Sequence, residues 1–439
     1  MDKVLMISLG CDKNLVDSEE MLSSLVKGGY EMTDLEEEAD VIIVNSCCFI
    51  SDAKEESINT IIEMGQLKVE GKLKALVVTG CLGKRYEKEI REQIPEVGAV
   101  LGTESYDRIL QTVDRILGRD RLEDGSGYLP ERDRILLTTG HYAFLKIAEG
   151  CNKNCTYCII PKVRGSYRSF PIEDLVREAE RLASRGVKEL VLVAQETTLY
   201  GIDLYGRKSL PELLKKLCRV DGIHWIRIMY CYPEEITDEL IQTIKEEPKV
   251  CHYLDIPIQH CNDDVLKRMG RRTRKAELLD TINKLREEIP DIALRTTLIS
   301  GFPGESQEAH EELYNFVNEV EFDRLGVFTY SPEEGTLAEQ MEDQIEESLK
   351  EERRDELMLL QQEISADKSQ EYIDKIMEVI VEGELPEEGV YVGRTYRDAA
   401  DVDGYVFFHA MRELMSGEFV KVEITDSSEY DLKGVMIDE

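Results

Sequence analysis

The stretch "GCNKNCTYCIIP" (residues 150–161) places three cysteines on one short segment: Cys151, Cys155 and Cys158. It follows "YAFLKIAE", a run of apolar residues typical of a buried β-strand. A structural zinc site uses four ligands and disulfides use cysteines in pairs, so a group of three suits neither. Three thiolates can instead hold three irons of a cubane cluster and leave the fourth iron open to a small molecule. Zinc with a distant fourth ligand, or buried cysteines without metal, are the alternatives.

Five further strand-like runs follow the first one, and helical sequence separates each from the next. They are "KELVLVA", "HWIRIMYC", "HYLDIPI", "IALRTTLIS" and "DRLGVFTY". Six β-α units in one direction predict an α/β fold of the TIM type, as a barrel or an open partial barrel. Enzymes with this fold carry their active sites at the carboxyl ends of the strands, where the cysteine segment lies. We assign residues 136–371 to this domain, which ends in a charged helix over residues 343–371.

The two ends of the chain predict different folds. Near the start, "KVLMISLG", "ADVIIVNS" and "KALVVTG" alternate with amphipathic helical stretches, which indicates a doubly wound parallel sheet over residues 1–135. Residues 119–135 are charged and contain Gly and Pro, so we expect them to form a linker. Residues 372–439 alternate at period two with turn residues between the runs, which predicts a small β-barrel.

The first domain holds a second group of cysteines that no local motif reveals. Cys11 ends the first predicted strand, Cys47 the next clear one, and Cys81 the one after. Because ligands gather outside the carboxyl ends of an open parallel sheet, we expect these three thiols to converge on a shared metal site. Coincidence is the alternative. Cys48, directly beside Cys47, leaves the choice of ligand open at this position.

The chain carries a formal net charge of −36, and its acidic excess extends over all three predicted domains. Nucleic-acid binders usually have a basic face, but the only basic cluster here is "KRMGRRTRK" (residues 267–275), which is more typical of a solvated helix end. Residues 372–439 contain 17 acidic and 6 basic side chains. We therefore expect a basic protein partner rather than direct binding of transfer RNA, with Asp398, Asp401 and Asp403 on the docking surface.

The cysteine content also predicts a compartment. Eleven cysteines in a chain without a convincing signal sequence argue for a reducing environment, where clustered thiols serve metal binding or catalysis. No apolar stretch approaches the ~20 residues needed to span a bilayer. We expect a cytoplasmic protein without a membrane partner.

With CxxxCxxC after the first barrel strand, the sequence resembles the radical S-adenosylmethionine (SAM) enzymes. In that family the open iron of a 4Fe-4S cluster is chelated by the amino and carboxylate groups of SAM, whose reductive cleavage gives a 5′-deoxyadenosyl radical. The resemblance implies SAM contacts from "TTLISGFPGE" (residues 296–305) and from polar residues at strand ends. The expected cofactor-binding residues are Tyr157, Gln195, Glu196, Gln259, Gly301, Gly304 and Glu305.

Two groups of three cysteines and a terminal β-barrel resemble one family in particular, the methylthiotransferases, over nearly the whole chain. The terminal barrel is similar to the TRAM module. "SLGCDKNLVDSE" and "VIIVNSCCFI" look like the branch that modifies the S-twelve protein of the small ribosomal subunit, whereas transfer-RNA-modifying members more often read "YGCQMN". Asp12, Cys48 and the pair Ala400–Asp401 depart from the usual pattern without removing a ligand. The resemblance favours Cys47 over Cys48.

This resemblance implies transfer of a methylthio group to the β-carbon of an aspartate in ribosomal protein S-twelve, free or in the subunit. The cluster on Cys151, Cys155 and Cys158 would make the radical. A second 4Fe-4S cluster, on the first-domain triplet, would carry the sulfur. An electron donor such as flavodoxin or ferredoxin is implied, whereas no side-chain acid, base or nucleophile is required. A transfer-RNA methylthiotransferase would share every cysteine, and a non-catalytic metal-containing RNA-binding module is the alternative of another class.

Overall fold

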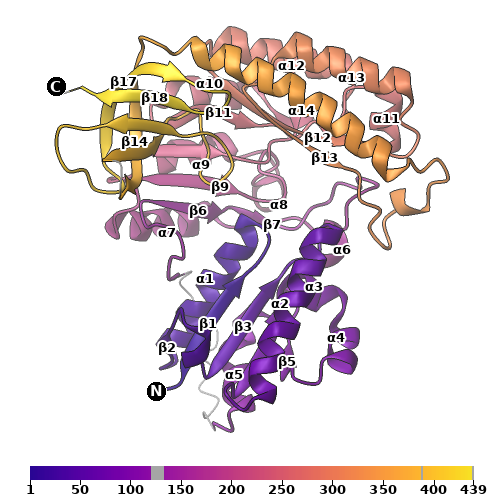
Figure 1. Ribbon diagram of the computed structural model, residues 1–439, viewed down its shortest axis with the longest axis vertical. Helices are drawn as coiled ribbons and strands as arrows, with labels where there is room; N and C mark the ends of the chain where they lie inside the picture. The colour runs from indigo at the N-terminus through magenta and orange to yellow at the C-terminus, as the bar shows by residue number, and fades with distance from the viewer. Residues whose placement is uncertain (120–132, 387–388, 438–439) are drawn as a thin grey trace.

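The computed structural model describes residues 1–119, 133–386 and 389–437, and Figure 1 shows how its parts are arranged. An amino-terminal α/β unit lies at one end, below a larger array of strands and helices, and the last strands form a small barrel beside that array. The linker predicted over residues 119–135 falls largely within residues 120–132, which lie outside the described part of the chain. Among the described helices, none has the length and apolar character that crossing a membrane requires.

The amino-terminal sheet is parallel throughout, in the order β2-β1-β3-β4-β5. Its strands are β1 (Lys3–Ser8), β2 (Glu31–Met32), β3 (Val41–Ser46), β4 (Ala75–Thr79) and β5 (Ala99–Val100), and its helices are α1 (Asp12–Lys27), α2 (Ser51–Val69), α3 (Gly80–Arg85), α4 (Glu87–Gln93) and α5 (Ile109–Ile116). In β3, Ile42 and Val44 pack into one apolar cluster, whereas Val41 and Ile43 pack into another. Both faces of the sheet are therefore covered, and the predicted doubly wound sheet is confirmed.

The central sheet has six parallel strands in the order β13-β12-β11-β10-β9-β6. They are β6 (Tyr142–Lys146), β9 (Glu189–Val193), β10 (Trp225–Ile228), β11 (Val250–Asp255), β12 (Ala293–Ser300) and β13 (Arg324–Thr329). The longer helices are α7 (Ile172–Ser184), α9 (Leu210–Leu217), α10 (Asp238–Glu246), α12 (Lys275–Glu288), α13 (Gln307–Val320) and α14 (Glu347–Gln370), and the short ones are α6 (Ile160–Val163), α8 (Ile202–Tyr205) and α11 (Asp263–Arg268). Each strand is added beside its predecessor and the edges β6 and β13 stay apart, which confirms a partial TIM-type barrel.

The chain ends in a closed five-stranded barrel with the order β14-β15-β16-β18-β17, as the period-two pattern predicts. Its strands are β14 (Ile376–Leu385), β15 (Val390–Arg394), β16 (Val406–His409), β17 (Phe419–Ser427) and β18 (Leu432–Met436). Buried ion pairs join it to the central sheet: the carboxylate of Glu189 lies 2.7 Å from Arg227 and 2.7 Å from Arg394. Burial alone would raise the pKa of Glu189, but the two guanidiniums lower it to about 2, so this carboxylate stays charged inside the interface.

The expected docking surface on this barrel needs a correction. Asp398 is buried and pairs with Arg324 of the central sheet. Asp403 has a side chain only 2% exposed and accepts a hydrogen bond of 2.8 Å from the hydroxyl of Tyr253. The expectation is therefore wrong for these two aspartates, because the segment after β15 folds against the central sheet and neutralises buried basic groups there. Asp401 is exposed, although its carboxylate accepts a hydrogen bond from the hydroxyl of Tyr142.

Candidate active site

The segment with Cys151, Cys155 and Cys158 is a closed loop at the carboxyl end of β6. Two short antiparallel strands, β7 (Ala148–Glu149) and β8 (Arg168–Ser169), pair at its base. The amide of Cys151 donates to the carbonyl of Gly165 at 3.2 Å, and the amide of Cys158 donates to the carbonyl of Cys155 at 3.1 Å. These turns place three thiols on one compact loop, as the spacing predicts.

The electrostatics of this loop suit a positively charged group. Burial raises the pKa of Cys151 to about 11 and that of Cys158 to about 12, and repulsion by neighbouring thiolates adds to both effects. Thiols with raised pKa values lose their protons when a metal takes the place of those protons. The donor set therefore fits an iron–sulfur cluster, in which each thiolate binds a different iron. Among the described residues, no three Cys, His, Asp or Glu side chains are arranged to hold a single metal ion.

Aromatic and basic residues surround Cys155. The hydroxyl of Tyr232 lies 3.8 Å from its sulfur, and the guanidinium of Arg271 lies 4.3 Å from the centre of the Tyr232 ring. A cavity of about 70 Å³ opens here, between these side chains and Lys153. The ammonium of Lys153 pairs with Glu234 at 3.2 Å. This arrangement offers both charges and an aromatic ring to a small polar ligand beside the cysteine loop.

Two of the predicted SAM contacts lie at the end of β9 and have unused polar atoms. Gln195 donates to Glu149 at 2.7 Å, but its Oε1 is buried and has no hydrogen-bond partner among the described residues. Glu196 accepts from the amide of Thr198 at 3.1 Å, whereas its Oε2 is equally buried and unpartnered within the described part. Burial raises the pKa of Glu196 to about 7. Because buried polar atoms normally have partners, these two fit a polar ligand, and their role stays a prediction.

The segment "GFPGE" after β12 is held by its own contacts. Glu305 accepts from the amide of Gly301 at 2.8 Å and pairs with Arg353 at 3.0 Å, so both carboxylate oxygens already have partners. Gly301 and Gly304 have φ values of +71° and +82°. A Cβ would lie 2.2 Å from Lys350 at Gly301 and 2.5 Å from Arg268 at Gly304. These contacts give the segment a structural role, and the predicted SAM contact stays untested.

The two remaining predicted contacts, Tyr157 and Gln259, pack against this segment and the strand before it. The ring of Tyr157 packs edge-on against Phe302, with 6.4 Å between ring centres, so the cysteine loop contacts the turn after β12. Gln259 has a φ of +70°, and its backbone amide donates to Thr297 at 2.9 Å. Gln259 thereby forms a parallel bridge with Leu298 of β12, beyond the end of β11.

The second triplet is brought together by the register of the amino-terminal sheet. Ser46, the last residue of β3, forms a parallel bridge with Gly80, which directly follows β4, so the next residues, Cys47 and Cys81, leave the sheet side by side. Gly10 lies so close to Cys47 that an added Cβ would be 2.7 Å from its sulfur, which places the adjacent Cys11 on the same edge. Burial raises the pKa of Cys47, and it raises that of Cys81 to about 12. The convergence predicted from strand ends is consistent with this geometry.

Cys48 differs from its neighbour. Its side chain is fully buried and belongs to an apolar cluster with Leu82 and Ile159, whereas Cys47 is 7% exposed. A thiol surrounded by apolar side chains behaves as a small hydrophobic residue. The packing therefore favours Cys47 as the ligand, in agreement with the resemblance.

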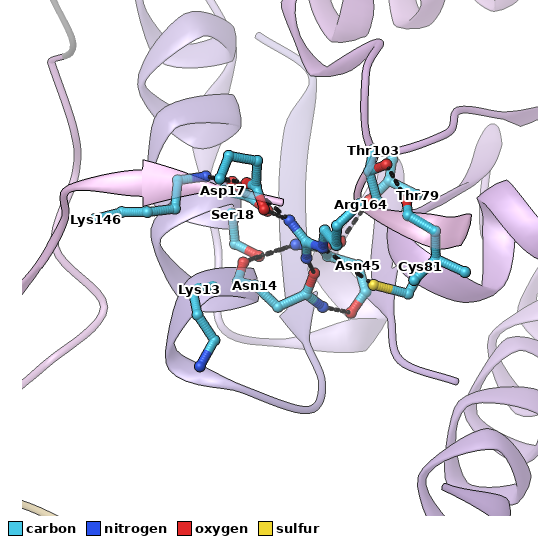
Figure 2. A network of polar contacts seen from close by, with 12 residues as sticks. Lys13, Asn14, Asp17, Ser18, Asn45, Thr79, Cys81, Thr103, Lys146 and Arg164 are labelled. Carbon is cyan, nitrogen blue, oxygen red and sulfur yellow. Dashed lines mark hydrogen bonds and ion pairs between the residues drawn. The ribbon is translucent and has the colours of Figure 1, made fainter. Parts of the chain in front are cut away.

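One residue that the sequence does not single out connects the two triplets. Arg164 follows α6, six residues after Cys158, and its Nε donates to the sulfur of Cys81 at 3.2 Å (Figure 2). The only local signal is a basic residue on the same segment as the cysteines. Its contact with Cys81 depends on how the two domains pack, which sequence spacing does not give.

Three segments of the chain match known families. Residues 3–102 match the uncharacterized protein family UPF0004, residues 145–317 match the radical SAM superfamily, and residues 373–437 match the TRAM domain. The radical SAM match implies SAM and a 4Fe-4S cluster as cofactors, in agreement with the sequence analysis.

Similar proteins extend over the whole chain. The ribosomal protein uS12 methylthiotransferase RimO of Lachnoclostridium phytofermentans is 60% identical over 98% of this chain and 99% of its own length. The protein of that name from Clostridioides difficile is 50% identical, with 100% of both chains covered. A solved structure of the radical SAM methyltransferase TsrM from Kitasatospora setae, with a 4Fe-4S cluster bound, has a TM-score of 0.57 over 77% of this chain and 74% of its own; at 13% identity this shows the fold alone. By its full-length relatives, the chain belongs to the family of ribosomal protein uS12 methylthiotransferases.

Proposed function

We propose that this protein transfers a methylthio group to the β-carbon of an aspartate in ribosomal protein uS12, the S-twelve protein. The observation that carries the proposal is the pair of cysteine triplets, each at the carboxyl ends of parallel strands, in a chain whose full-length relatives are uS12 methylthiotransferases. A non-catalytic RNA-binding module has no need of two such sites.

The residues have separate tasks in this proposal. When bound, a 4Fe-4S cluster with SAM supplies a carbon radical, able to take hydrogen from a C–H bond too weakly acidic for a side-chain base. Cys151, Cys155 and Cys158 would hold that cluster. Gln195 and Glu196, with their unpartnered buried oxygens, would bind the polar groups of SAM. No side chain is assigned as acid, base or nucleophile.

The amino-terminal triplet would hold a second 4Fe-4S cluster and present the sulfur for transfer. Its ligands are Cys11, Cys47 and Cys81. The loop triplet and the sheet triplet lie on facing domains connected by Arg164, which contacts Cys81 and shares a segment with Cys158. A substrate aspartate reaching between the domains would meet both sites.

The partners follow from charge. Ribosomal proteins are basic because they lie against RNA, and a chain with a net charge of −36 attracts such a partner and repels transfer RNA. We propose uS12, free or in the small subunit, as the substrate, a flavodoxin or ferredoxin as the electron donor, and the cytoplasm as the location. The alternative substrate is an adenosine of transfer RNA.

The substrate is tested by incubating the anaerobically reconstituted protein with SAM, a reductant and either uS12, small subunits or transfer RNA. Mass spectrometry of uS12 should show the mass of one added methylthio group on a single aspartate. The variant with Cys11, Cys47 and Cys81 replaced by alanine is the control and should give no adduct. Methylthiolated adenosine together with unmodified uS12 would assign the enzyme to the transfer-RNA branch.

The docking surface has to be tested on exposed acids rather than on the buried aspartates of the interface. Glu413, Glu423 and Glu429 are exposed on the small barrel. Their replacement by lysine should lower kcat/KM for uS12 by about tenfold, mainly through association, and should weaken its salt dependence. The matched control carries the same charge change on the exposed outer-helix residues Glu287, Glu319 and Glu351. Equal losses in both variants would show that only total charge matters.

A further inference from the structure

We propose that Arg164 is a positioning residue of the amino-terminal cysteine site, which sets the electronic properties of the bound cluster by donating an N–H···S hydrogen bond to Cys81. The inference rests on the proposed second cluster. Arg164 belongs to neither triplet. It lies on the segment that carries Cys151, Cys155 and Cys158, but it contacts Cys81 of the amino-terminal triplet.

The guanidinium of Arg164 has a partner on each of its three nitrogens (Figure 2). Its Nη1 donates to Asp17 at 2.6 Å and to Glu149 at 3.2 Å, and its Nη2 donates to Asn14 at 2.7 Å. Its Nε donates to the sulfur of Cys81 at 3.2 Å. Since the side chain is only 3% exposed, water does not compete for these contacts.

Arg164 has carboxylate partners apart from the sulfur of Cys81. Lys146 of β6 pairs with Asp17 and, at 3.0 Å, with Glu149. The two cations are thus in direct contact with the carboxylates of Asp17 and Glu149, and the charge of Glu20 also acts on Lys146. A guanidinium needed only to clamp the two domains would be satisfied by Asp17, Glu149 and Asn14. The Nε–H directed at Cys81 is an additional contact, and it is aimed at a ligand.

The partners of Arg164 on α1 fix the direction in which its Nε–H group points. Asp17 and Asn14 lie on α1, which starts directly after Cys11. The side-chain amide of Asn14 donates to the carbonyl of Leu9 at 2.7 Å, and the side-chain amide of Asn45 donates to the carbonyl of Asn14 at 2.8 Å. The start of α1 is thus tied to the ends of β1 and β3, and the donor is held in the same frame as the sheet triplet.

A fixed donor to a ligand sulfur has a defined consequence. An N–H···S hydrogen bond and a nearby positive charge stabilise electron density on the cluster, which raises its reduction potential. Contacts of this kind also hold the ligand in place, and their loss typically weakens metal binding by about 10–100-fold. Arg164 should therefore affect both the potential of the amino-terminal cluster and its retention of iron.

The test uses the full chain with Cys151, Cys155 and Cys158 replaced by alanine, so that only the amino-terminal cluster is observed. In this background we compare Arg164→Lys, which keeps the charge but loses the Nε donor, with Arg164→Gln, which loses both. Both variants should shift the midpoint potential to more negative values, Arg164→Gln further, and should alter the electron paramagnetic resonance signal of the reduced cluster. Iron loss to a chelator should be about tenfold faster.

Arg85 provides a matched control. It also spans the two domains, donating to the carbonyl of Cys48 at 3.4 Å and pairing with Glu333 at 3.6 Å. Its guanidinium reaches the Cys48 thiol, but it contacts none of the three proposed ligand sulfurs of Cys11, Cys47 and Cys81. Arg85→Lys should leave the potential and the spectrum unchanged. If Arg164→Lys also leaves both unchanged, or if Arg85→Lys shifts them equally, the inference is wrong. If Arg164→Gln fails to fold, Arg164→Lys, which can still pair with Asp17, decides the question. A background protein that binds no cluster at all would instead overturn the proposed second cluster.

Discussion

The two cysteine triplets reach a similar ligand set by different routes. Cys151, Cys155 and Cys158 lie on one loop whose ends are fixed by the β7–β8 pair, so a few local hydrogen bonds define their geometry. The sheet triplet depends on the register of three strands that are distant in sequence. A loop can change with little effect on the core, whereas a sheet edge changes only with the sheet. Variants of the two sites should therefore fail in different ways.

The largest expected effect is at the loop. Replacing Cys151, Cys155 and Cys158 by alanine should abolish release of 5′-deoxyadenosine from SAM, because the cluster that binds and cleaves SAM is lost. Iron should fall from roughly eight to roughly four atoms per chain, since each cubane cluster carries four. Iron analysis and chromatography of the nucleoside products measure both quantities. Thermal unfolding of the apo-proteins is the control for folding, and an intact protein with only one cluster would contradict the two-site assignment.

The corresponding change at the sheet triplet separates cleavage of SAM from transfer of the sulfur. With Cys11, Cys47 and Cys81 replaced by alanine, SAM should still be cleaved, because the loop site is unchanged, while methylthiolated uS12 should be absent. Product analysis of one reaction mixture measures both. A folded variant that cannot cleave SAM would show that the two sites do not act separately.

The sequence predicts both triplets, for different reasons. The loop triplet follows from spacing alone, because neighbouring residues of one loop are necessarily close. The sheet triplet follows from the apolar runs before Cys11, Cys47 and Cys81, because parallel strands align their carboxyl ends. The same periodicities predict the two large sheets and the terminal barrel, which the structure confirms, but not the short β7–β8 pair.

Contacts between domains are not encoded in such patterns. In the sequence Arg164 is one basic residue among many, and only the packing of the two domains places it against Cys81. Asp398 and Asp403 read as surface charges, although they neutralise buried groups of the central sheet. In each case the deciding partner is distant in sequence, and one charged residue gives no sign of whether it meets water or another charge.

Two glycines, one beside each cysteine site, test how tightly each site is tied to the rest of the fold. Gly80 and Gly150 each precede a cysteine, with φ values of +91° and +78°, and an added Cβ would lie 2.3 Å from the Ser46 carbonyl oxygen and 2.4 Å from that of Ser166. Alanine should cost about 2 kcal/mol or more at either site, since both the left-handed conformation and the close approach exclude a side chain. Gly80→Ala strains the buried sheet, so it should lower the global free energy of unfolding measured with urea. Gly150→Ala should mainly release the iron of its own loop. The reverse distribution would mean that the loop, and not the sheet, is the more tightly integrated site.

The smallest expected effect distinguishes the adjacent cysteines Cys47 and Cys48. Burial raises the pKa of Cys48 to about 11, and its side chain has no solvent exposure and belongs to an apolar cluster. Cys48→Ala should therefore keep all the iron and cost about 1 kcal/mol of stability, the effect of removing one buried atom from a packed cluster. Cys47→Ala removes a ligand from the sheet site and should lose that site's iron while leaving SAM cleavage intact. Iron content of the two purified variants, with urea unfolding of the apo-proteins, measures both effects. Iron lost from Cys48→Ala and kept in Cys47→Ala would make Cys48 the ligand, and would require the chain after β3 to turn its other thiol toward Cys11 and Cys81.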